Sequence, residues 1–175
     1  SSSQGDLGLV LLGFLTAVYP IAMFFASPIL GALSDKHGRK PVLIASIFGT
    51  AISYFVFAYA IMTKNIVLLF ASRIIDGATG GNISVAQAAV ADLSTPEDRT
   101  KNYGVMGAAF GLGFIFGPFI GGVLSSPEVM PSFSAYTPFI FSGILSLINV
   151  FLIISYFKES IKEKHPEKKI HLLAS

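Results

Sequence analysis

Arg73 and Asp76 are opposite charges that lie three residues apart inside a long apolar run. At this spacing two side chains meet on one face of a helix, so the pair could form a structural ion pair. An arginine near the middle of a membrane span costs ~2.5–3.5 kcal/mol on insertion scales, and should therefore face protein or a water-filled cavity. We expect the face that carries the pair to point inward. Polar and small residues continue it in steps of three and four: Gly77, Gly80, Ser84 and Gln87.

A second charged group separates two apolar runs at residues 31–41, with the sequence GALSDKHGRKP. Such charges could do no more than fix the topology of the chain. Because backbone groups in lipid must be satisfied within each segment, we expect two antiparallel helices joined by a short loop. Gly31 and Gly38 permit that turn. The charged residues of the stretch are Asp35, Lys36, Arg39 and Lys40.

The elements that carry these groups must be membrane spans. The chain of 175 residues is 53% hydrophobic and only 13% charged, whereas soluble domains are about 25% charged. A bilayer core of about 30 Å needs about 20 apolar residues per helix. The sequence therefore predicts an all-α polytopic membrane protein with five spans. We expect them at residues 7–33, 42–62, 66–93, 103–124 and 139–157.

The residue inventory argues against an enzyme. Cysteine is absent, and the three histidines, at positions 37, 165 and 171, show no metal-ligand spacing. No nucleophile with an adjacent base and no phosphate-binding loop lies in or near the spans. We therefore expect no cofactor, no metal and no nucleic-acid partner, and the lipid bilayer as the surrounding medium.

The fourth expected span is unusually rich in glycine. In lipid, small residues spaced four apart let helix backbones approach closely, so we expect tight packing of this helix. Pro118 removes a backbone donor and is expected to fix a bend. The run could serve packing alone. Its glycines are at positions 104, 107, 111, 113, 117, 121 and 122.

Basic residues predict the orientation. The loops near Asp35 and Glu97 and the tail at 158–175 alternate to one side, and that side holds all lysines and arginines of the loops and tail except Lys64. By the positive-inside rule this side is cytoplasmic, in a plasma membrane or bacterial inner membrane, with the N-terminus outside. We expect residues 1–157 to form the helical bundle and residues 158–175 a solvated linker or an interfacial helix.

The stretch at 31–41 resembles the loop signature between the second and third helices of the major facilitator superfamily of secondary transporters. The run Gly113-x-x-x-Gly117-Pro118-x-x-Gly121-Gly122 resembles the fifth-helix signature of its antiporters. With Arg73 and the residues after it, the chain looks most similar to drug/proton antiporters that include tetracycline exporters. The resemblance implies that the five spans match helices two to six of a six-helix half, without the first helix and the C-terminal half.

The resemblance also implies roles for the charged residues. Asp35 would dock on the N-terminal end of a second-half helix, while Arg39 pairs with Asp92 to hold a gate shut. Arg73 would tune a carboxylate that binds the coupling proton, although relatives often carry another residue where this chain has Asp76. Gly31, Gly38 and Lys40 belong to the same gating motif, and Gln87 is a candidate for lining the cavity.

The implied function is proton-coupled efflux of drugs or small organic metabolites by alternating access. Two alternatives remain: a symporter or uniporter of the same superfamily for sugars or organic ions, and a truncated membrane half that does not transport. The residues do not identify the cargo.

Overall fold

The computed structural model describes residues 2–161, which form helices and turns and contain no strand. Five helical segments in this range are long and apolar enough to cross a membrane, as the sequence predicts. The third of them is divided into two helices. The bounds are α1 Ser2–His37, α2 Arg39–Thr63, α3 Ile66–Gly80, α4 Asn82–Leu93, α5 Arg99–Ser125 and α6 Thr137–Tyr156.

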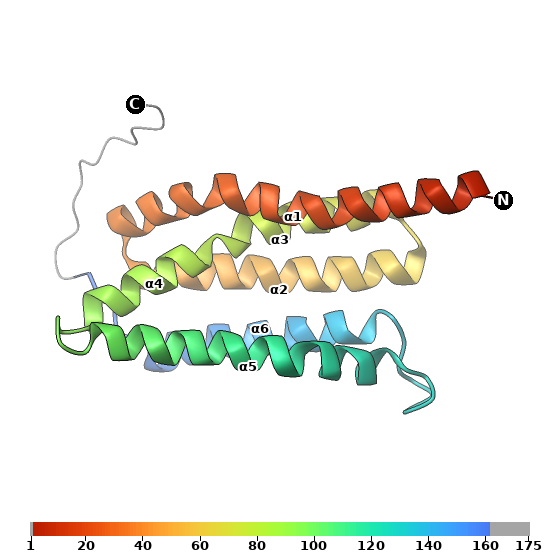
Figure 1. The fold of residues 1–175 in the computed structure, drawn as a ribbon. Coiled ribbons are helices and arrows are strands. Elements are labelled where there is room, and N and C mark those ends of the chain that lie inside the picture. The colour runs from red at the N-terminus through yellow and green to blue at the C-terminus, as the bar shows by residue number, and fades with distance from the viewer. Residues whose placement is uncertain (1, 162–175) are drawn as a thin grey trace.

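The helices form an antiparallel bundle in which chain neighbours are not always neighbours in space (Figure 1). α1 packs mainly on α3 and α4, and α2 lies between α3 and α6. α5 lies at the edge of the bundle and touches α4 and α6. The α1–α2 turn, the α4–α5 turn and the end of α6 meet at one end of the bundle, which we call the charged end (Figure 1).

The interior of the bundle is small and polar, and its outside is apolar. The buried hydrophobic residues are few and mostly small, whereas large side chains such as Phe24, Phe114 and Phe151 are at least 64% exposed. Buried hydroxyls such as those of Ser46 and Ser72 donate to carbonyls of their own helix, which satisfies them without water. An apolar exterior around a close-packed small-residue interior is the pattern of helices that associate in lipid.

The third expected span is divided where it touches α1. A Cβ at Gly81 would lie 2.9 Å from the Ser27 backbone, and one at Gly77 would lie 2.6 Å from the Ala22 Cβ. Only glycine allows this approach. The Ser84 hydroxyl also donates to the Ser27 carbonyl at 3.3 Å, so the break between α3 and α4 is held against α1.

The expected tight packing of the glycines in α5 is wrong for the described part of the chain. A Cβ at any of the seven glycines of α5 would have no atom of another segment within 4 Å. The physical reason is the position of α5 at the edge, where most of its length touches no other described helix. The helix continues unbroken through Pro118.

The expected turn between two antiparallel helices is present (Figure 1), but it is shorter than the gap between the expected spans, because both arms of the stretch 31–41 are helical. α1 runs to His37 and α2 starts at Arg39, so Gly38 alone joins them. Gly38 has a φ of 109°, a conformation open to glycine and costly for other residues. Gly31 lies inside α1 and takes no part in the turn.

Candidate functional site

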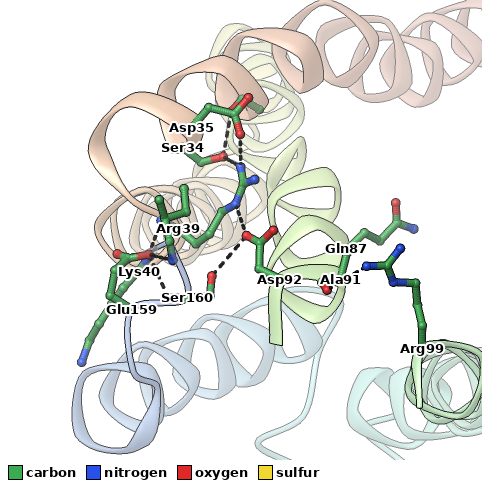
Figure 2. Close-up of polar contacts among 12 residues, drawn as sticks. Ser34, Asp35, Arg39, Lys40, Gln87, Ala91, Asp92, Arg99, Glu159 and Ser160 are labelled. Atoms are coloured by element: carbon green, nitrogen blue, oxygen red, sulfur yellow. Dashed lines mark hydrogen bonds and ion pairs between the residues drawn. The ribbon is translucent and has the colours of Figure 1, made fainter. Parts of the chain in front are cut away.

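Arg39 is the centre of an ion-pair cluster at the charged end (Figure 2). The guanidinium is nearly buried, since the residue is 8% exposed. Its Nη1 lies 2.7 Å from Asp35 Oδ1 and donates to Ser34 Oγ at 2.5 Å, while Nε donates to Asp92 Oδ2 at 3.0 Å. One side chain therefore joins α1, α2 and α4. The pairing of Arg39 with Asp92 is present, as expected from the resemblance.

Asp35 also pairs with Arg39, one turn away along the chain, and its expected contact with a helix of the second half stays a prediction. Its side chain is 41% exposed and that of Asp92 is 31% exposed. Surface ion pairs contribute little, whereas a buried guanidinium depends on its partners. The contribution of the cluster to stability therefore depends mainly on the contacts of the buried Arg39 guanidinium.

Glu159, just after α6, is a member of this site that sequence reasoning missed. Its Oε1 accepts the backbone N–H of Arg39 at 2.8 Å, and its Oε2 accepts that of Lys40 at 3.1 Å. Burial alone would raise the pKa of the Glu159 carboxyl, but these bonds and the N–H groups of Ile161 and Ser160 outweigh it and lower the pKa below the ordinary value. The ionised carboxylate is thus the form that binds α2.

The described start of the expected tail is solvated in part, because Lys158 and Glu159 are exposed whereas Ser160 packs against the bundle. Ser160 is 6% exposed, and its hydroxyl donates to Asp92 Oδ2 at 3.4 Å. Its neighbour Glu159 is bound to α2 as above. The remainder of the expected tail, residues 162–175, lies outside the described residues. No signal in the alternating lysines and glutamates of the tail singled out Glu159.

Arg73 and Asp76 form the second candidate site, in the middle of the bundle. Arg73 Nη1 donates to Asp76 Oδ2 at 3.1 Å, and the Asp76 side chain is 6% exposed. The guanidinium carbon lies 4.1 Å from the ring centre of Phe57 on α2 and 5.7 Å from that of Phe139 on α6. The two aromatic faces hold the cation, while the carboxylate neutralises it. The pair faces inward, as expected.

Comparisons with known proteins agree with this arrangement of membrane spans. A family model described as the Major Facilitator Superfamily matches residues 3–173. The chain belongs to this superfamily. It is 39% identical over 155 residues to the class C tetracycline resistance protein of Escherichia coli, a match that covers 88% of this chain and 37% of that protein.

Two further similarities lie outside the tetracycline resistance proteins. Major facilitator superfamily domain-containing protein 10 of Bos taurus is 42% identical over 117 residues, covering 67% of this chain and 25% of that protein. The crystal structure of the human organic anion transporter MFSD10 (TETRAN) superposes with a TM-score of 0.75 at 31% identity. That match covers 89% of this chain and 34% of the other.

Superfamily membership establishes a multi-pass membrane protein whose relatives are transporters rather than enzymes. The chain spans about a third of the length of the tetracycline resistance relatives that it matches. Among the described residues no group of histidine, aspartate and glutamate could hold a metal ion.

The remaining expected site residues lie apart from both clusters. Gln87 is exposed, so its side chain does not point into the described bundle, and its expected place in the cavity stays a prediction. Val85 is fully buried, and a residue two positions along a helix points about 200° away. In Figure 2 the Gln87 side chain lies on the side of α4 near Arg99. Its carbonyl accepts the Tyr103 hydroxyl at 3.0 Å.

The antiporter-like run lies on the exposed length of α5. Part of it borders an open apolar hollow of about 500 Å³. The residues that line the hollow are Met106, Ala109, Phe110, Gly113 and Phe114. In this superfamily member the run therefore faces away from the helices that the structure describes.

Proposed function

We propose that this chain supplies helices two to six of a secondary active transporter that works by alternating access. The C-terminal half of the same transporter would supply the opposite wall of the pathway. The observation that carries the proposal is the Arg39 cluster, which joins three helices at one end of the bundle. Because a change of access moves helices relative to one another, contacts of this kind can exist in one state and be absent in the other.

The proposed transport is proton-coupled efflux of drugs or small organic metabolites. The similarity to tetracycline resistance proteins supports this choice. Arg73 and Asp76 supply a charged pair in the bundle on which a proton could act, with Gln87 further along the pathway. The run on α5 would face the second half, and its members are Gly113, Gly117, Pro118, Gly121 and Gly122.

A second candidate cargo is an organic anion. The similarity to the solved human organic anion transporter favours it, and the Arg73 guanidinium, whose side chain is 21% exposed, could attract an anion. The two candidates share the mechanism and differ in the charge of the cargo.

Transport in sealed vesicles tests the proposal. A carrier that joins residues 1–175 to a first helix and a C-terminal half should accumulate tetracycline or an organic anion in inside-out vesicles when a proton gradient is imposed. An uncoupler should abolish the accumulation, and residues 1–175 alone should show none, because the pathway needs walls from both halves. Absence of transport of both compounds by the joined carrier would refute the proposal.

The charged end is assigned to the cytoplasm, because ten of the eleven basic residues in the loops and tail fall on its side of the sequence. Cysteine is absent from the chain, so single cysteines report without background. A Lys36→Cys variant in right-side-out cells should be protected from a membrane-impermeant thiol reagent, while Lys64→Cys at the opposite end should react. Labelling of the first and protection of the second would reverse the assignment.

A further inference from the structure

Glu159 is bound to the beginning of α2 although it lies 120 positions further along the chain than Arg39. The N–H groups of Arg39 and Lys40 are the first two of α2 and have no acceptor within that helix. Gly38, which precedes them, has no side chain that could cap them. The Glu159 carboxylate takes this place from another segment, with one oxygen on each N–H.

Each of the two segments supplies a side chain to the contact between the start of α2 and the end of α6. Lys40 Nζ donates to the carbonyl of Ile154 in the last turn of α6 at 2.9 Å. An anion at the start of one helix and a cation at the end of another both match the helix dipoles. The start of α2 is thereby fixed relative to the end of α6.

Gly38 leaves the space that this carboxylate occupies. A Cβ at Gly38 would lie 2.9 Å from Glu159 Cδ and closer still to its Oε2. The glycine therefore serves the turn and the contact together. In Figure 2 Glu159 lies beside the start of α2, on the side away from Asp35.

The contact between Glu159 and the backbone of Arg39 also fixes the position of the Arg39 Cα, from which the side chain extends. Arg39 is bound at its backbone by Glu159 and at its guanidinium by Asp92. Ser160, next to Glu159, donates to the same Asp92 Oδ2 that accepts Arg39 Nε. The segment after α6 thus touches the Arg39–Asp92 pair at both of its ends.

We propose that Glu159 is a positioning residue that caps α2 and thereby holds the Arg39 guanidinium against Asp92. The segment after α6 is then part of the cluster rather than a free connection. The inference stands on the contacts of this chain, and only its consequence for gating rests on the proposed function. A displacement of residues 159 and 160 would release Arg39 from Asp92.

A triple-mutant comparison separates positioning from simple capping. The coupling between Arg39 and Asp92 is measured from the unfolding equilibria of Arg39→Ala, Asp92→Ala and the double variant, in the full 175-residue chain in lipid. We expect a coupling of about tenfold in the equilibrium constant with Glu159 present, falling to about threefold or less with Glu159→Gln. A simple cap would lower stability and leave the coupling unchanged, which would overturn the proposal.

Glu97→Gln is the matched control, because it removes the same charge at the same end of the bundle. Glu97 is exposed, and its side chain makes no hydrogen bond or ion pair with any residue in the described range 2–161. It should leave the coupling at its original value. A loss of coupling equal to that of Glu159→Gln would show a general charge effect and overturn the proposal.

Hydrogen exchange gives a second measurement that does not depend on the cycle. Glu159→Gln should speed exchange of the Arg39 and Lys40 amides about tenfold relative to the Glu97→Gln chain. If Glu159→Gln does not fold, Glu159→Asp should show the same direction, because its carboxylate is one methylene shorter. Unchanged exchange at both amides would refute the contact. Neither measurement involves transport, so failure here and failure of the proposed function are distinguishable.

Discussion

Replacing Arg73 with alanine should lower the free energy of unfolding by ~3–5 kcal/mol, the usual effect of leaving one member of a buried pair without its partner. The Asp76 side chain is 6% exposed, and Arg73 lies 3.1 Å from it. The variant also removes the cation from the ring face of Phe57, 4.1 Å away. Unfolding in a denaturing detergent, or the temperature of unfolding in lipid, measures the loss.

Two further variants identify the cause. Arg99→Ala removes the same charge from the exposed start of α5, where the one side-chain hydrogen bond of Arg99 within residues 2–161 is to the Ala91 carbonyl at 3.5 Å. It should change stability by about 0.5 kcal/mol or less. Adding Asp76→Asn to Arg73→Ala should restore most of the stability, since no unpaired charge then remains. If Arg73→Ala cost no more than Arg99→Ala, the ion pair would contribute nothing to the bundle.

The contrast between the two charged sites shows what a sequence can encode locally. Arg73 and Asp76 are three residues apart, and helical geometry alone brings them together. The position of Arg73 over the Phe57 ring, which itself packs on Phe139, could not be read in this way, because it depends on which helices are neighbours. Hydropathy gives the number and length of spans, but every span has an apolar outside in lipid, so it says little about their order around the bundle.

The same limit explains the missed contact at Glu159 and the wrong packing of α5. A carboxylate in a run of alternating charges looks solvated, and only the return of the chain to α2 gives it four backbone donors. The glycines of α5 predict close packing by composition, whereas the described helices leave them open. The Arg39–Asp92 pair was predictable only through resemblance to a family, since the residues are 53 positions apart.

The second large effect is expected at Arg39, in transport rather than in stability. Interactions that exist in only one conformation set the balance between conformations, and a coupling of ~1–3 kcal/mol changes that balance about tenfold or more. Arg39 binds Asp35, Ser34 and Asp92. In a complete carrier that contains this chain, Arg39→Ala should therefore reduce the initial rate of efflux at least tenfold at matched expression.

The contacts of Arg39 also predict how its variants combine. Asp92→Ala leaves Arg39 bound to Asp35 and should therefore reduce the rate of efflux less than Arg39→Ala does. Asp35→Asn should leave folding largely intact and favour the inward-facing state. The variant that lacks both Arg39 and Asp92 should transport no worse than Arg39→Ala alone, because the pair acts as a unit. Lys101→Ala, an exposed charge on α5 at the same end, is the control and should keep the original rate. Strictly multiplicative losses for Arg39→Ala and Asp92→Ala would mean that the two residues act independently, and the charges at the turn would then serve only to fix the topology of the chain.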